Sequence, residues 1–341
     1  MGLLTFLTAR RTDKHAQQDV LHLYGPYGLR SFLRANLLLT QAHLGCRFQV
    51  HELRTREDPD MDPVPLPPHA AEVVPANESR TPLAEKTHSP GSTTGDIYAD
   101  ENGAWVDFIP KPCKAKVTAV SIQHTVPCLG FVVQERRIPA KIDPDVYLPP
   151  IEANKAALFA RGENPYRLLR LLQYGQSVTL PDGTKLLPPS VSRPRRKVTI
   201  LGDTSDASAI IPYAKDSDIL VHEVTRALLP TTPPREQISY AELKAATVKA
   251  GHSLPDMAAS LAAQINCRQL WVTHLSPMLT VGHHALSQKK ADMIVEQLRK
   301  SVPPTMTVRV AQDYQVVSLS RLQQAENTQE ETIASPLEAS L

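Results

Sequence analysis

The sequence is poor in cysteine, and its cysteines follow no recognisable pattern. The 341 residues contain only Cys46, Cys113, Cys128 and Cys267, with no Cys-x-x-Cys pair. Disulfide frameworks and zinc ribbons both need closely spaced cysteines, so both classes are excluded. We predict buried thiols in a reducing, intracellular environment, and the compartment (nucleus, mitochondrion or cytoplasm) stays open.

Long hydrophobic runs and an excess of charge of one sign are also missing. No stretch reaches about 18 consecutive apolar residues, so we expect a soluble protein that does not enter a membrane. Lys and Arg total 37 against 35 Asp and Glu, and this net charge of +2 neither requires nor excludes a nucleic-acid partner. The hydrophobic fraction of 42% is sufficient for a globular core.

Composition and periodicity divide the chain into four regions. Residues 1–54 show strand-like, turn-like and helix-like patterns and are predicted to be ordered. Residues 55–103 are rich in Pro, Ser, Thr and acidic residues, which predicts a disordered insertion. Strand and helix patterns return over residues 104–318, and the tail from 319 to 341 is predicted to be disordered.

Three short apolar runs in the second ordered region end in residues that can bind metal or move protons. These are residues 197–201 before Asp203, residues 218–221 before His222 and Glu223, and residues 268–273 before His274. Polar residues at the carboxyl ends of buried strands lie where α/β folds place their chemistry. Further strands are expected over 105–109, 306–310 and 315–319, and helices over 151–162, over 285–300, and over 253–265 with Ser253 as N-cap.

Three of the polar residues form a candidate metal site. A metal-dependent hydrolase needs imidazoles and carboxylates that converge from rigid strand ends, because zinc then activates a bound water and polarises a phosphoryl oxygen. His124, Asp203 and His274 fit this requirement. A lone histidine is more often a core or surface group than a ligand, so the argument depends on the combination.

Several strings resemble the ribonuclease Z (tRNase Z) subfamily of the metallo-β-lactamase superfamily, which cleaves precursor tRNA at its 3′ end. The resemblance covers residues from about 20 to 54 and from 104 to 318. It implies an α/β fold, the αββα sandwich, and a zinc-dependent endoribonuclease. The matching strings are Leu23 to Leu29, His124 to Phe131, Gly202-Asp203-Thr204, His222-Glu223-Val224-Thr225, Gly251-His252-Ser253 and Thr273 to Pro277.

The resemblance also implies residue roles. Asp203 would bridge two zinc ions, with His124 on one of them and His274 on the other. His252 would donate a proton to the leaving 3′ oxygen, with Glu223 holding its imidazole. The alternative for His252 is a solvent-exposed residue at the start of a helix.

An RNA-binding arm is implied over residues 141–175, the position that the arm occupies in the family. Arg161, Arg167 and Arg170 would contact phosphates of precursor tRNA there. The family's Gly-Pro element has its nearest counterpart in Gly162-Glu163-Asn164-Pro165.

The family's His-x-His-x-Asp-His motif, which supplies four metal ligands, does not occur in the sequence. We therefore expect an N-terminally incomplete sandwich that binds metal weakly and does not cleave RNA alone. A second copy of the chain or a complementary half-domain would help cover the exposed sheet. Two alternatives stay open: a catalytically dead paralogue that binds RNA or a partner protein, and another metallo-β-lactamase phosphodiesterase or sulfatase.

Overall fold

The computed structural model describes two compact units, the body (within residues 1–134 and 197–315) and the inserted unit (within 135–196). The described residues are 20–59, 64–74, 96–110, 113–136, 139–189, 195–229, 238–276, 284–312, 314–317 and 319. The expectations for residues 1–19, for 75–95 and for the tail beyond 319 lie outside these ranges. Among the described helices, none combines the length and the apolar character that crossing a membrane requires.

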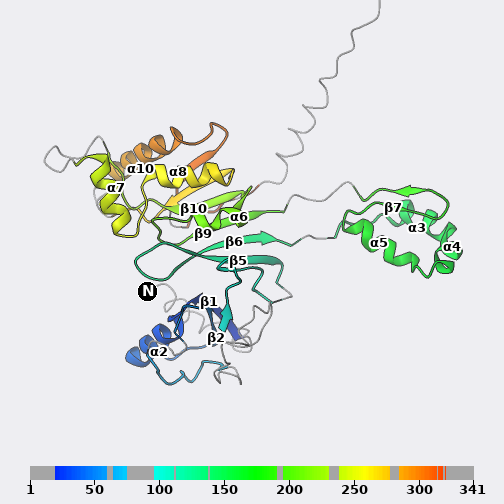
Figure 1. The fold of residues 1–341 in the computed structure, drawn as a ribbon, viewed down its shortest axis with the longest axis horizontal. Coiled ribbons are helices and arrows are strands. Elements are labelled where there is room, and N and C mark those ends of the chain that lie inside the picture. Colours follow the sequence, from blue (N-terminus) through cyan, green and yellow to red (C-terminus); the bar gives the residue numbers. More distant parts are fainter. Residues whose placement is uncertain are drawn as a thin grey trace, which may run out of the picture. The chain divides into compact units, whose positions relative to one another are not determined.

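A seven-stranded sheet forms the centre of the body, with the strand order β12-β11-β10-β9-β6-β5-β4. The strands β9 to β12 run parallel, and β6 pairs antiparallel with β9. Helices cover one face of this sheet (Figure 1). The strands are β4 (Ala104–Trp105), β5 (Ala115–Ile122), β6 (Cys128–Glu135), β9 (Lys197–Leu201), β10 (Ile219–Glu223), β11 (Gln269–Thr273) and β12 (Thr307–Val310). The helices are α6 (Ile211–Ala214), α7 (Tyr240–Lys249), α8 (Pro255–Gln264) and α10 (His284–Arg299), with a 3-10 turn η3 (Ser208–Ile210).

A second, three-stranded parallel sheet packs on the other side of the large sheet (Figure 1). It consists of β1 (Val20–Pro26), β2 (Arg47–Arg54) and β3 (Asp96–Tyr98), with α2 (Leu29–Thr40) outside it. Alternate residues of β2 face opposite sides, since Phe48 and Val50 pack with α2 residues whereas Leu53 packs with Trp105 between the sheets. The layers are helix, sheet, sheet and helix, which confirms the predicted αββα sandwich.

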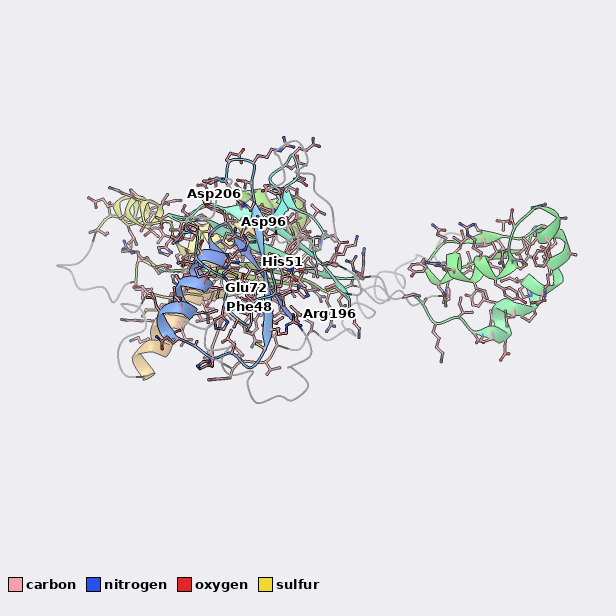
Figure 2. The ribbon with its side chains drawn as sticks, turned by 90° about the horizontal axis from the view of Figure 1, so that it is seen from below. Phe48, His51, Glu72, Asp96, Arg196 and Asp206 are labelled. Carbon is pink, nitrogen blue, oxygen red and sulfur yellow. The ribbon has the colours of Figure 1, made fainter. Side chains whose placement is uncertain are left out.

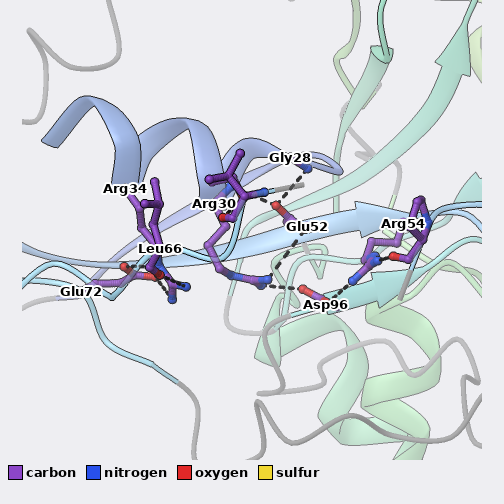
Figure 3. Close-up of polar contacts among 11 residues, drawn as sticks. Gly28, Arg30, Arg34, Glu52, Arg54, Leu66, Glu72 and Asp96 are labelled. Carbon is purple, nitrogen blue, oxygen red and sulfur yellow. Dashed lines mark hydrogen bonds and ion pairs between the residues drawn. The ribbon is translucent and has the colours of Figure 1, made fainter. Parts of the chain in front are cut away.

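A network of buried charges ties the small sheet together (Figure 3). Glu52, whose side chain is 0% exposed, accepts hydrogen bonds from the backbone N–H groups of Gly28 (3.1 Å) and Arg30 (2.9 Å) at the start of α2. The guanidinium of Arg30 then donates to Asp96 (2.6 Å), and Arg54 donates to the other oxygen of Asp96 (3.0 Å). One carboxylate thus orients the helix, and the other joins β3 to its neighbours.

Both described ends of the predicted disordered insertion, residues 64–74 and 96–103, depart from that expectation. Glu72 forms an isolated bridge with Phe48 at the edge of β2 (Figure 2) and pairs with Arg34 at 2.8 Å. Residues 96–98 form β3, and Ile97 is buried between the sheets. Composition did not reveal this order because each end also depends on an arginine of α2 or β2 that is distant in sequence.

Three other predicted elements differ from the structure in their bounds or are not found. Strand β4 stops at Trp105 because Asp107 has a φ of 50° and begins a turn. Helix α8 begins at Pro255 with Leu254 at the N-cap, because the Ser253 hydroxyl donates instead to the Thr204 carbonyl at 2.5 Å. The predicted strand over 315–319 is absent from the described residues of that range.

The inserted unit has a core of its own. Its elements are α3 (Pro144–Ala153), α4 (Lys155–Ala160), α5 (Pro165–Gln173), β7 (Val178–Thr179) and β8 (Lys185–Leu186). Asp143 and Asn164 cap α3 and α5, each helix starting with proline. The predicted helix over 151–162 is interrupted at Asn154, whose side chain instead bonds Asp182. Ile151, Leu158 and Leu172 are fully buried in this unit.

We predict that Glu52→Ala lowers the free energy of unfolding by about 3–5 kcal/mol, because it removes the acceptor of the Gly28 and Arg30 backbone N–H groups and one of the two carboxylates beside the Arg30 guanidinium. Urea unfolding measures this loss. Glu101→Ala removes an exposed acid from the same unit and serves as the control. Equal stability of the two variants would contradict a supporting role for the Glu52 network.

Candidate metal centre

The carboxyl edge of the large sheet brings together residues from distant parts of the sequence. Strands β9, β10 and β11 are parallel neighbours, so Asp203, Glu223 and His274 come at or just after the same edge. His124 follows β5, and a bridge between Gln123 and Asp206 holds its loop against the segment after β9. The structure thus places the predicted strand-end residues at one edge, as the sequence indicated.

His124 is oriented by the backbone of Gly251. Its Nδ1 lies 2.7 Å from the Gly251 carbonyl oxygen, so Nδ1 is the protonated nitrogen and Nε2 keeps its lone pair. Gly251 has a φ of +82°, and a Cβ at this position would clash with Nδ1 of His124 and lie 3.0 Å from its Cε1. Only glycine allows this approach without displacing the imidazole.

Asp203 and His274 face each other across the edge. Nε2 of His274 is 3.5 Å from Oδ2 of Asp203, and their side chains are 47% and 38% exposed. His274 has a φ of 54°, an uncommon conformation for a residue with a side chain, and one that is often found at functional sites. Both residues are accessible to a ligand from solvent.

Glu223 is the buried acid behind the site, with its side chain 1% exposed. Burial alone would raise the pKa of its carboxyl group. Hydrogen bonds from Thr225, from the Thr204 N–H and from His252 outweigh burial and lower that pKa below its ordinary value. Glu223 is therefore ionised at neutral pH.

His252 is paired with this carboxylate rather than exposed at a helix start. Its Nδ1 lies 2.9 Å from Oε1 of Glu223, and its side chain is 20% exposed. Its ring centroid is 5.1 Å from that of His124 and 5.3 Å from that of His274. The geometry suits a group that exchanges a proton at Nε2 while the carboxylate holds Nδ1.

His222 points away from this group, although it precedes Glu223 directly. It is buried, its Nδ1 lies 2.7 Å from the Glu223 carbonyl oxygen, and burial lowers the pKa of its imidazole. Alternation along a strand puts neighbouring side chains on opposite faces, so only Glu223 can reach the site.

The donor atoms at this edge suit zinc in their chemistry, but both groups of three that the described residues form include His252, and neither is the predicted set of His124, Asp203 and His274. One ligand atom from each of His124, Asp203 and His252 lies within 4.8 Å of the others, as does one from each of Glu223, His252 and His274. Imidazole and carboxylate are usual zinc ligands, and an oxygen partner on the second ring nitrogen is the usual way to orient such a histidine. His124 and His252 have such a partner in Gly251 and Glu223.

Comparison with known proteins gives related sequences over most of the chain. The chain is 28% identical to ribonuclease Z of Streptococcus suis over 300 residues, which are 87% of this chain and 74% of that protein. It is 27% identical to human zinc phosphodiesterase ELAC protein 1 over 326 residues, 93% of this chain and 79% of that protein. No family model matches the chain.

The chain is a homologue of ribonuclease Z. Human tRNase Z, short form, can be superposed at 19% identity with a TM-score of 0.46, over 94% of this chain and 74% of that one. Leu23 to Leu29 spans the end of β1 and the start of α2, whereas the described residues of the other matching strings lie at or beside the sheet edge that carries the candidate metal centre.

Sequence reasoning assigned no role to two residues of this ribonuclease Z homologue that the structure places at the centre. Both residues lie in strings that resemble the family. Gly251 directly precedes His252, and Thr225 stands two positions after Glu223. A glycine directly before His252 was the available signal for a close backbone approach. Arg161, Arg167 and Arg170 belong to the inserted unit, where all three are exposed.

We predict that Gly251→Ala weakens the binding of added zinc at least tenfold, because the new Cβ displaces His124. Gly103→Ala is the matched control: Gly103 has a φ of +73° but nothing within 4 Å of a built Cβ. The control should lose only about 1–2 kcal/mol of stability, the cost of a left-handed alanine, and should bind added zinc as the wild type does. Chelator-competition titration and thermal unfolding of both variants measure these effects, and an unchanged zinc affinity in Gly251→Ala would refute the orienting role.

Proposed function

We propose that this chain provides the downstream ligands of the metal centre of a zinc-dependent endoribonuclease that removes 3′ trailers from precursor tRNA. The homology makes the chain a hydrolase of the nuclease and phosphodiesterase class. The observation that carries the finer proposal is the arrangement of His124, Asp203 and His274 beside the buried Glu223–His252 pair.

Each residue of the site has a chemical task in this proposal. His124, Asp203 and His274 would hold zinc, which when bound would activate a water for attack and neutralise charge at the phosphate. His252 holds a proton at Nε2 and gives it to the leaving 3′ oxygen. Glu223 stabilises the protonated imidazole through Nδ1 and keeps its ring in place.

The inserted unit would bind the body of the tRNA. Helix α5 buries Leu168 and Leu172 and leaves Arg167, Arg170 and Tyr174 on its exposed side. The Arg170 guanidinium lies 6.0 Å from the centroid of the Tyr174 ring. Arginines next to an exposed aromatic ring provide phosphate contacts and a stacking surface, and both are used in RNA binding.

The number of metal ligands in the chain limits how tightly the chain alone would bind zinc. The three proposed ligands give each of two zinc ions two protein contacts, one of them shared, whereas zinc prefers about four ligands. We infer that a complementary half-domain or a second copy of the chain accompanies it.

A second candidate function follows from the same absence of His-x-His-x-Asp-His. In this alternative the chain is a catalytically dead ribonuclease Z-like paralogue that binds RNA or a partner protein. RNA binding would then not depend on metal, and Asp203→Ala would leave both the RNA affinity and the biological activity unaltered.

We predict that the purified chain, dialysed against metal-free buffer, keeps less than one zinc per molecule and does not cleave a 3′-extended precursor tRNA. Zinc analysis and a cleavage assay at added zinc test this. Cleavage after addition of a polypeptide that carries the His-x-His-x-Asp-His motif, and its loss in Asp203→Ala, would support the endonuclease. If the chain alone held two zinc ions tightly and cleaved the precursor tRNA, the claim that it has too few ligands would be wrong.

We predict that Arg167→Ala with Arg170→Ala weakens precursor tRNA binding about tenfold and flattens its salt dependence, because two phosphate contacts are lost. Filter binding at several salt concentrations measures both. Lys185→Ala with Lys155→Ala removes the same charge from the same unit and should change affinity much less. Equal losses in the two double variants would argue for a general charge effect instead of a specific surface on α5.

A further inference from the structure

Thr225 connects the proposed proton-transfer pair to a proposed metal ligand. It follows β10 directly, and its hydroxyl oxygen lies 2.5 Å from Oε2 of Glu223 and 2.9 Å from Nδ1 of His274. The same oxygen is 3.2 Å from Nδ1 of His252. One side-chain hydroxyl thus contacts three groups of the site.

The direction of these hydrogen bonds follows from counting protons. A hydroxyl has one proton to donate, and an ionised carboxylate can only accept. The short contact to Glu223 therefore takes the hydroxyl proton of Thr225. Toward His274 the oxygen of Thr225 can only accept, so Nδ1 of His274 must carry a proton, and in the neutral imidazole the lone pair is then on Nε2.

The orientation of His274 agrees with this assignment. Its Nε2 is the nitrogen that faces Asp203, at 3.5 Å, where a shared metal ion would need a lone pair. The ring is almost half exposed and stands on a backbone with a φ of 54°, so few packing contacts restrain it. The hydrogen bond to Nδ1 and the stacking on the His252 ring are the restraints on the imidazole other than its contact with Asp203 in the described contacts.

The geometry points to Thr225 as the positioning residue that fixes the tautomer and the orientation of His274 for metal binding. Through Thr225, the carboxylate of Glu223 holds a metal ligand as well as the proton donor His252. The inference rests on the proposed metal centre, and it adds to that centre a coupling between Glu223 and His274. Loss of the hydroxyl should weaken metal binding even though Thr225 touches no metal.

Zinc affinity of the full chain tests this role without any activity measurement. Thr225→Val keeps the shape of the side chain but has no hydroxyl, and Thr225→Ser keeps the hydroxyl. Chelator-competition titration should show zinc binding about 10- to 100-fold weaker in Thr225→Val and nearly unchanged in Thr225→Ser. Thr125→Val, at an exposed threonine next to His124, is the matched control and should bind as the wild type does. Wild-type affinity in Thr225→Val, or equal losses in the Ser and Val variants, would overturn the inference.

The tautomer of His274 in the metal-free chain separates this inference from the proposed function. Nitrogen-15 NMR of the histidine rings, with His274→Asn to assign the signal, should show the proton on Nδ1 in the wild type and in Thr225→Ser. In Thr225→Val, the proton of His274 should be on Nε2 instead of Nδ1 in part of the molecules. A wild-type His274 protonated on Nε2 would overturn the role of Thr225. If the wild type bound no zinc, the proposed metal centre would fail, while the tautomer would still decide the role of Thr225.

Discussion

The site depends on one buried charge, the carboxylate of Glu223. It lies at the end of β10, and the donors around it include the Thr204 N–H, the N–H and hydroxyl of Thr225, and Nδ1 of His252. An unpaired carboxylate at this depth would be costly, so these donors are constrained to their positions for as long as the chain is folded. The same constraint fixes the loop after β9, the segment after β10 and the residues before α8, which all contribute to the metal centre.

The sandwich provides the frame in which this charge can act. Parallel strands bring Asp203 and His274 to one edge, and the close approach of Gly251 brings His124 to the same place from β5. A second buried network, centred on Glu52, fixes α2 to the small sheet in a similar way. In both networks a carboxylate accepts hydrogen bonds from backbone N–H groups, so the position of each acid is determined by main chain as well as by charge.

Regular parts of this structure could be predicted from the sequence because they follow local patterns. Short apolar runs followed by Asp203, Glu223 and His274 indicated a shared strand edge, and the edge exists. Ser253 matched the pattern of an N-cap, but a tertiary hydrogen bond to Thr204 takes the Ser253 hydroxyl. The order at Glu72 and Asp96 depends on Arg34, Arg30 and Arg54, which are distant in sequence. The contact of Thr225 with His274 is likewise invisible before the strands are paired.

The central claim is that His124, Asp203 and His274 bind metal, and the ligand shell of bound zinc tests it most directly. Cys128 is the competing ligand to consider, because its Sγ lies close to Gly202, next to Asp203. X-ray absorption of the full chain with substoichiometric zinc should show only nitrogen and oxygen at about 2.0–2.1 Å, with the outer-shell pattern of imidazole. A sulfur neighbour at about 2.3 Å, or the absence of imidazole scattering, would contradict the claim.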